Sequence, residues 1–463
     1  MKVRNVFRLM LSVILLLLAA SSAGSGLARE LQPMELSDAV DLSADLAANF
    51  PWFNIEVDTP GNVGQYASVA INPLSDTTYV SYYDATNMNL RLAMNRGFGS
   101  GGNCGPDNSW LCYTVDSGGD VGKFSSIAIN PVNGEIGIAY YDATNGKLKY
   151  AHVEICTICP WKIDTIDAPI LFPTDNKGQF SSLKYHSNGK PYIAYYFENT
   201  GGVDALMVAT GDVSGGNCGI GSVAGKWQCD TIQIGEGVGQ YASLALDGAG
   251  QPRVAYSDGG NNALMYAYQN GGYWTIREIL PTNSGQYASL DVDVNNGDLP
   301  HIAHYDATNG KLGYAVYVGS NGNCGFNNSA TKFEWQCDEI ATMGAQSTHP
   351  RTRDVSLAVD KAGFPIIAYS WYYGTPFSGR GFSRARPAAA LGLQSGNCGP
   401  QDLWQCEGIQ GGLNTGDYSA IAVHPSGLAT IAYYYGNTVF DSALRVSYQR
   451  FHQIYLPLVM KNQ

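Results

Sequence analysis

Positive charge is scarce in this sequence of 463 residues. It contains 27 Lys and Arg against 39 Asp and Glu, so its formal net charge at pH 7 is −12. Charged residues of both signs make up only 14% of the chain. Proteins that bind nucleic acid or an anionic membrane surface present basic patches. The composition therefore argues against both classes of partner and favours a β-rich extracellular protein.

Long hydrophobic runs are lacking after the N-terminus. Lys2, Arg4 and Arg8 precede the apolar run Leu9–Ala20, and small residues follow as far as Ala28. This pattern is typical of a secretory signal peptide, and the run is short for a membrane span. We therefore predict a signal peptide at residues 1–28, a secreted or cell-surface location and no transmembrane helix.

Motifs for catalysis and for cofactors are also lacking. The sequence contains no G-x-S-x-G, no H-E-x-x-H and no P-loop. Asp291–Gly297 resembles a calcium loop, but its Gly lies one position too late. His301 and His304 are expected to pack beside a strand, and Glu198 is the best isolated candidate for a catalytic carboxylate. The sequence favours a protein without catalytic activity, bound metal or cofactor.

The cysteines fall into five close pairs, which is typical of local disulfides in an exported protein. A metal site would need four convergent ligands, and only one pair has the C-x-x-C spacing. Disulfides are therefore predicted for all five pairs, which are Cys104/Cys112, Cys156/Cys159, Cys218/Cys229, Cys324/Cys337 and Cys398/Cys406.

A unit of about 60 residues recurs seven times along the chain. Three copies have nearly the same sequence: Val63–Ala93, Val121–Ala151 and Gly285–Ala315. Six copies align on a serine, and the seventh has Ala420 at that position. The serines are Ser68, Ser126, Ser182, Ser243, Ser289 and Ser356. Such a period predicts a radial array.

Each unit contains four short strand-like runs joined by turn residues. In the second copy we expect strands at Ser125–Asn130, Ile136–Asp142, Lys147–Val153 and Trp161–Ile166, with an Asn-Gly turn at residues 145–146. Four antiparallel strands in seven units predict an all-β fold, a seven-bladed β-propeller at residues 51–450. Residues 29–50 are predicted to be a linker and 451–463 a tail.

One tryptophan opens the fourth strand of each blade. The last repeat lacks a fourth strand, and the segment Trp52–Asp58 at the other end of the chain can supply it and close the ring. Small residues such as Ala67 and Ser126 in the first strands are expected to fill the crowded hub. The other tryptophans of the series are Trp110, Trp161, Trp227, Trp274, Trp335 and Trp404.

Two repeated features share the face that carries the loops between the second and third strands. One is the Gly-Gln-Tyr entry to the first strand, as at Tyr66, Tyr241 and Tyr287. The other is an aspartate that ends the second strand and is interpreted as a turn carboxylate, because Asp accepts hydrogen bonds from its own turn. A ligand-binding rosette is the alternative. These aspartates are Asp84, Asp142, Asp258 and Asp306.

Blade 6 departs from the repeat, and we identify it as the candidate ligand site. Its entry loop and the long loop at residues 374–386 hold five arginines close to two aromatic residues. Arginine and aromatic side chains together can bind a carboxylate- or sulfate-bearing sugar. A solvated loop whose arginines pair with acidic neighbours is the alternative. The candidate residues are Arg351, Arg353, Trp371, Tyr372, Arg380, Arg384 and Arg386.

The repeat S-L-A-x-D-x-x-G-x-P-x-I-A-Y-Y-D-x-x-N-G-x-L-x-Y-A resembles that of exported bacterial β-propellers, over residues 52–450. It is distantly similar to sialidase-type and lectin-type propellers. The Asp boxes of sialidases, S-x-D-x-G-x-T-W, do not occur in this sequence. The resemblance implies the fold, and no catalytic residue is carried over from it.

Three functions remain open at this point. We expect a secreted, non-catalytic monomer that binds a glycan or a protein at the cell surface. A carbohydrate-active enzyme, either a glycoside hydrolase or a polysaccharide lyase, would use the same loop face. A structural component of the cell envelope would need no ligand.

Overall fold

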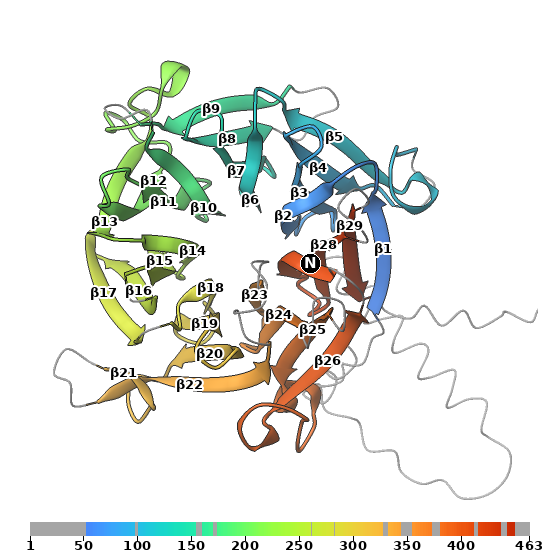
Figure 1. Cartoon of the computed structure of the whole chain (residues 1–463), viewed down its shortest axis with the longest axis vertical. Coiled ribbons are helices and arrows are strands. Elements are labelled where there is room, and N and C mark those ends of the chain that lie inside the picture. The colour runs from blue at the N-terminus through green and yellow to red at the C-terminus, as the bar shows by residue number, and fades with distance from the viewer. Residues whose placement is uncertain are drawn as a thin grey trace, which may run out of the picture. The chain divides into compact units, whose positions relative to one another are not determined.

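The computed structural model describes residues 52–97, 101–153, 160–169, 174–260, 262–281, 283–326, 332–343, 354–372, 380–411, 415–436 and 442–449. The predicted signal peptide, linker and C-terminal tail lie outside these residues. Within them, seven antiparallel sheets form a ring (Figure 1). The predicted seven-bladed propeller is confirmed.

The blades follow one another along the chain, each running outward from an inner first strand. Blade 1 consists of β2 (Val63–Ile71), β3 (Thr78–Asp84), β4 (Asn89–Asn95) and β5 (Trp110–Asp116). Blade 2 consists of β6 (Val121–Ile129), β7 (Ile136–Asp142), β8 (Lys147–Val153) and β9 (Lys162–Asp167). Blade 3 consists of β10 (Asn176–Tyr185), β11 (Pro191–Glu198), β12 (Asp204–Thr210) and β13 (Gln228–Gly235). Blade 4 consists of β14 (Val238–Leu246), β15 (Pro252–Asp258), β16 (Ala263–Asn270) and β17 (Tyr273–Leu280).

The remaining three blades complete the ring. Blade 5 consists of β18 (Gln286–Asp293), β19 (Leu299–Asp306), β20 (Lys311–Tyr317) and β22 (Phe333–Thr342), with the short β21 (Cys324–Phe326) outside them. Blade 6 consists of β23 (Val355–Val359), β24 (Pro365–Tyr372), β25 (Arg380–Pro387) and β26 (Trp404–Gly411). Blade 7 consists of β27 (Thr415–Val423), β28 (Ala429–Gly436), β29 (Ser442–Gln449) and β1 (Trp52–Asp58).

Blade 7 joins the two ends of the described chain. Strand β1 pairs antiparallel with β29, with Trp52 opposite Gln449 and Asp58 opposite Leu444. The N-terminal strand therefore supplies the missing outer strand, as predicted from the position of Trp52. This pairing leaves β29 without an exposed edge.

A serine hydroxyl links one inner strand to the next at six of the seven interfaces between blades. The backbone N–H of Ile127 in blade 2 donates to Ser68 Oγ in blade 1 at 3.1 Å, and Leu183 donates to Ser126 Oγ at 2.9 Å. The same bond recurs at the later interfaces, where the donors are Leu244, Leu290, Leu357 and Ile421 and the acceptors Ser182, Ser243, Ser289 and Ser356. The serines of the repeat therefore connect neighbouring blades, and Ala420 lacks the hydroxyl at the interface between blades 7 and 1.

A second connection lies farther from the axis. The strand-two tyrosines Tyr82, Tyr140 and Tyr195 are buried. Each donates its hydroxyl, at 2.6 Å, to an aspartate that ends the outer strand of the preceding blade. The aspartates are Asp58, Asp116 and Asp167, and each also pairs with a cation, Arg91, Lys149 or Lys177. A buried tyrosine hydroxyl needs such a partner.

Four of the five predicted disulfides lie among the described residues and are confirmed: Cys104–Cys112, Cys218–Cys229, Cys324–Cys337 and Cys398–Cys406. Cys156 and Cys159 lie outside the described residues. Each disulfide closes the hairpin between the third and fourth strands of its blade. Closure of loops of this size stabilises a fold by about 3 kcal/mol in the chain-entropy model.

The disulfide hairpins reach across to the outer strand of the preceding blade. In the hairpin of blade 3, the N–H of Gly219 donates to the carbonyl of Ile166 at 2.8 Å, and Ile220 donates to Thr165 at 3.0 Å. In blade 6, the N–H of Gly399 donates to the carbonyl of Ile340 at 2.9 Å. These contacts satisfy backbone groups that the outermost strand of a sheet would otherwise leave unpaired.

Removal of one serine hydroxyl should measure the link between inner strands. Ser243→Ala leaves the N–H of Leu290 without its acceptor, so the free energy of unfolding should fall by about 1 kcal/mol. Ala420→Ser is the reciprocal change and should stabilise the protein by providing an acceptor for strand β2. Urea denaturation of both variants tests this. Equal stability of Ser243→Ala and wild type would contradict the role assigned to the hydroxyl.

Candidate functional site

The structure brings together only part of the residue set predicted for blade 6. Arg351 and Arg353 lie outside the described residues, and for Tyr372 in β24 and Arg380 in β25 the structure describes only the backbone. Trp371 lies in β24, half-buried, and its indole Nε1 donates to Ser383 Oγ at 2.9 Å.

Arg384 and Arg386 were expected in a loop, and that expectation is wrong. Both lie in β25 and are buried, with 2% and 3% of their surface exposed. Arg384 pairs with Glu407 at 2.6 Å, and Arg386 pairs with Asp360. Burial lowers the pKa of both guanidinium groups. Nη2 of each arginine therefore pairs with an acidic neighbour, whereas Nε and Nη1 of both are buried and have no hydrogen-bond partner among the described residues.

The position of Arg384 explains why an arginine is present there. Its guanidinium lies 5.4 Å from the ring of Trp52 in the next blade. In other blades a tyrosine makes the corresponding contact with the tryptophan of the next blade, as in the Tyr150–Trp227 pair. A cation–π contact in blade 6 thus replaces an aromatic pair. A ligand-binding role for the seven blade 6 residues stays a prediction.

The four repeated aspartates lie within their own turns. Asp84 accepts from the N–H of Thr86 at 3.0 Å, and Asp142 accepts from that of Asn145 at 3.1 Å. Asp258 and Asp306 accept from Gly260 at 3.2 Å and from Thr308 at 2.9 Å. Glu198, the isolated carboxylate, accepts from Asn176 and Gln179 at 2.9 Å.

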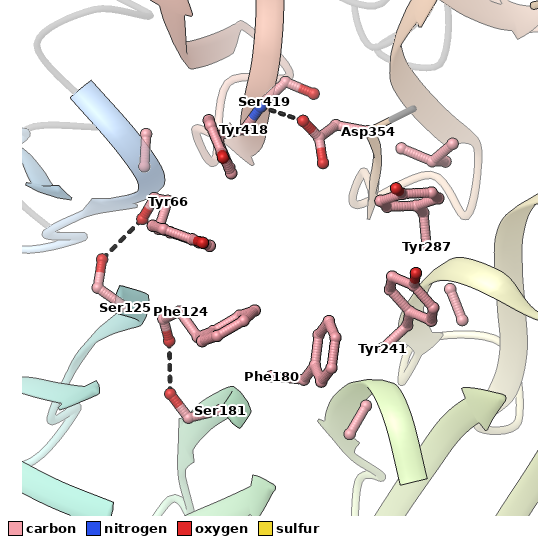
Figure 2. Close-up of a pocket in the computed structure, with 14 residues that line it drawn as sticks. Tyr66, Phe124, Ser125, Phe180, Ser181, Tyr241, Tyr287, Asp354, Tyr418 and Ser419 are labelled. Carbon is pink, nitrogen blue, oxygen red and sulfur yellow. Dashed lines mark hydrogen bonds between the residues drawn. The ribbon is translucent and has the colours of Figure 1, made fainter. Parts of the chain in front are cut away.

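The centre of the ring holds a group of aromatic side chains that the sequence suggested as a site only in the alternative interpretation, a ligand-binding rosette. Aromatic residues from six inner strands point toward the axis and line a pocket of about 240 Å³ (Figure 2). Adjacent ring centroids along this series lie 4.5–4.7 Å apart, with interplanar angles of 47–53°. We call them the aromatic ring, and its members are Tyr66, Phe124, Phe180, Tyr241, Tyr287 and Tyr418.

A repeated irregularity in the inner strands directs these side chains to the axis. All six residues have φ between 51° and 55°, a left-handed conformation that is uncommon outside glycine. In blade 1 the pairing between β2 and β3 shifts on both sides of Gln65, and Tyr66 lies within the second shift, which is a β-bulge. The bulge changes the direction of the side chain, so the hub contains aromatic rings in addition to the expected small residues.

The glycine two positions before each aromatic residue allows the inner strand to approach the preceding blade. An added Cβ at Gly122 would lie 2.7 Å from Leu90 Cα, and one at Gly239 would lie 2.7 Å from Leu206 Cα. Both glycines also have φ above 100°. The Gly-x-aromatic sequence is therefore required for this geometry.

Asp354 of blade 6 takes the place of a seventh aromatic residue. Its side chain lines the pocket between Tyr287 and Tyr418, and it is half-buried (Figure 2). The N–H of Tyr418 donates to its Oδ2. Asp354 is the only acidic residue among the lining residues that the structure describes, and these include no Lys, Arg or His.

The substitution of aspartate in blade 6 removes favourable contacts. Ser125 and Ser181 each donate to the carbonyl of the preceding blade's aromatic residue, at 2.8 Å to Tyr66 and 2.6 Å to Phe124. The hydroxyl of Ser419, at the same position after blade 6, is buried and has no partner among the described residues. The ring also lacks two aromatic contacts, which are worth about 0.5–1.5 kcal/mol each.

The pocket has two chemically different halves. The tyrosine hydroxyls and Asp354 belong to blades 4, 5, 6, 7 and 1, whereas Phe124 and Phe180 of blades 2 and 3 are apolar. Burial raises the pKa of Tyr66, Tyr241 and Tyr418, and the negative charge of Asp354 raises all three further. The tyrosines are therefore neutral at physiological pH.

Comparisons with known proteins give only distant similarities. No protein-family model matches the sequence, and no curated protein matches it. AofleA from Arthrobotrys oligospora is 12% identical in its structure-based match, which covers 86% of this chain and 92% of that chain with a TM-score of 0.41. A fucose-specific lectin from Aleuria aurantia is 12% identical over 76% of this chain and 96% of that chain, with a TM-score of 0.42. A Hadza microbial sialidase is 12% identical over 77% and 73%, also with a TM-score of 0.42.

No helix among the described residues is long and apolar enough to cross a membrane. Within the same part of the chain, no group of three or more His, Cys, Asp or Glu is arranged to hold a metal ion. His301 and His304 are buried in blade 5, as the sequence analysis expected from packing. His304 takes the position of the strand-two tyrosine, opposite Gly313, where an added Cβ would lie 2.3 Å from the imidazole.

His304 should make the stability of the protein depend on pH. Burial lowers its pKa from the ordinary 6.5 to about 4. The unfolded chain therefore binds a proton below pH 6.5 that the folded protein excludes, and stability falls as the pH drops from 6.5 through 4. Thermal unfolding of wild type and His304→Gln at a series of pH values tests this. The variant should lose less stability over this range, and identical slopes would contradict the assignment.

Proposed function

We propose that this protein is an extracellular, non-catalytic glycan-binding propeller, and that a sugar residue binds in the central pocket. Asp354 is the single observation that carries the proposal. An aromatic residue there would complete a ring that six other blades build, and aspartate replaces it at a cost in contacts. A position that departs from the pattern kept by the other six blades is the expected mark of a functional site.

The lining of the pocket suits a sugar. Asp354 and the four tyrosine hydroxyls offer acceptors and donors for sugar hydroxyls, and the aromatic rings offer apolar contact to C–H groups. The volume of about 240 Å³ is below the about 300–1,000 Å³ of a site for a drug-sized ligand. The pocket therefore suits one terminal residue of a longer chain.

The chemistry of the lining favours binding over hydrolysis. A glycosidase needs two placed carboxyl groups on either side of the scissile bond. Among the described lining residues, Asp354 supplies one carboxyl group. The four described disulfides are in keeping with an oxidising compartment. We extend the proposal to a secreted or surface-bound monomer that engages glycans at the cell surface.

Substitutions of Tyr241 test the site. The protein should bind members of a glycan array, and Tyr241→Ala should weaken binding of the best ligand by about tenfold or more, because the aromatic wall is lost. Tyr241→Phe keeps the ring and should have a smaller effect. Tyr273→Ala, at an exposed tyrosine of the outer strand β17, is the matched control and should bind as wild type.

Two results would count against the proposal. The central pocket would be the wrong site if a folded Tyr241→Ala variant, verified by its thermal unfolding, bound with unchanged affinity. Release of reducing sugar from the bound polysaccharide would instead show the enzymatic alternative to be correct.

A further inference from the structure

The outer strand of blade 3 lacks the cover that a neighbouring hairpin gives to other outer strands. β13 lies on the outer rim of the ring (Figure 1), and within the described part of the chain it pairs with β12 alone. Blade 4 joins its third and fourth strands by a tight turn through Gly271 and Gly272, where blades 1, 3, 5 and 6 have disulfide hairpins. No described backbone N–H from outside the sheet donates to β13. Its outer edge is therefore open.

Strand β9 of blade 2 shows what occupies such an edge. Residues 164–166 of β9 and 230–232 of β13 both read Asp-Thr-Ile, and the pairing with the third strand shifts at the same point in both. In β9 the carbonyls of the threonine and the isoleucine accept from the hairpin of blade 3 at 3.0 and 2.8 Å. The same carbonyls of Thr231 and Ile232 have no such donor among the described residues. One acceptor tripeptide is thus occupied and its copy is open.

The hairpins place a glycine against the tryptophan that opens the fourth strand. In blades 1, 5 and 6, an added Cβ on this glycine would lie 2.5–2.6 Å from Cδ1 of the tryptophan, so a side chain there would displace the indole. All three glycines have φ of 63–76°, which favours glycine. In blade 6 the same residue also donates its N–H to Ile340 in the outer strand of blade 5 at 2.9 Å. The glycines are Gly105, Gly325 and Gly399.

Without a hairpin, the tryptophan of blade 4 is less covered than its counterparts. The tryptophans of blades 1, 3, 5 and 6 are only 1–4% exposed, whereas Trp274 is half-buried. Trp274 and Ile232 of β13 pack against the same apolar cluster. Ile234, farther along β13, is 63% exposed. An indole ring and an open strand edge therefore border one apolar cluster, which is the pair of features that a hairpin glycine contacts in blade 6.

We propose that the open edge of β13 binds an extended segment of another protein by antiparallel pairing, with a glycine of that segment against Trp274. The N–H groups of this glycine and of the next residue donate to Ile232 and Thr231, as those of Gly219 and Ile220 do to β9. An apolar residue after the glycine suits the site, because Pro, Ile or Phe follows it in the described hairpins. Strand addition of this kind is a common mode of peptide recognition.

A peptide taken from the chain itself is the probe. It has the sequence of residues 214–223 with Cys218→Ser and carries a fluorophore at its N-terminus. The fluorescence polarisation should rise to saturation when the full-length protein is added. The matched peptide with Gly219→Ala should bind at least about tenfold more weakly, because a Cβ strains the left-handed backbone. Trp274→Ala in the protein, with folding verified by thermal unfolding, should weaken binding of the glycine peptide by a similar factor.

Exchange of the two connections tests the edge itself. Residues 212–226, placed in blade 4 instead of residues 270–273 together with Ile276→Cys for the disulfide, should cover β13. This variant should unfold at a higher temperature than wild type and bind the peptide at least about tenfold more weakly. The reverse exchange, residues 270–273 in blade 3 together with Cys229→Ile, should uncover β9. Titration calorimetry should then give two peptides bound per protein instead of one.

The outcomes are decisive for the open edge and separate from the test of the central pocket. A peptide that does not bind, equal binding of the glycine and alanine peptides, or full binding to the folded hairpin variant would overturn the inference. A wild-type dimer in sedimentation experiments that the hairpin variant converts to a monomer would also overturn it, since a second copy would then occupy the edge. The comparison of the two peptides uses wild type, so it holds even if an exchange variant does not fold.

Discussion

The packing of each inner strand against the next sets the spacing of the ring. At six of the seven interfaces a backbone N–H also donates to the serine Oγ of the preceding blade. The seventh interface, where Ala420 lacks the hydroxyl, keeps the same spacing, since the ring centroids of Tyr66 and Tyr418 lie 4.5 Å apart there. The angles of 47–53° between neighbouring aromatic planes are close to one-seventh of a full turn. The pocket at the centre is thus a product of the contacts between blades, and its width follows from their spacing.

The repeat made the architecture predictable. The strands predicted at Ile136–Asp142 and Lys147–Val153 agree with β7 and β8 residue for residue. The closure by Trp52 and the described disulfides could also be predicted, because strand period, turn residues and cysteine spacing are local signals. The inner strand β6 begins at Val121, four residues before its predicted start at Ser125, since the bulge interrupts the regular alternation of side chains.

The site was harder to predict because it depends on backbone geometry and on distant partners. The residue type of Tyr66 or Phe124 does not reveal a left-handed φ. The regular alternation of side chains along a strand therefore did not predict that these rings face the axis. The burial of Arg384 and Arg386 depends on Glu407 and Asp360, which lie far along the sequence. Alignment of the copies did contain one usable signal: Asp354 occupies the column that is aromatic in the other six.

Because disulfides close the hairpins, the redox state of the environment affects whether the outer strand edges of the ring are covered. Each described hairpin of blades 3 and 6 supplies hydrogen bonds to the last strand of its neighbour, so it acts as a cover over a strand edge as well as a closed loop. Reduction would release that cover while the serine links at the hub persisted. A reduced protein would then keep its ring but expose unpaired strand edges to other copies of the chain. In a reducing compartment we therefore expect the protein to aggregate before it unfolds.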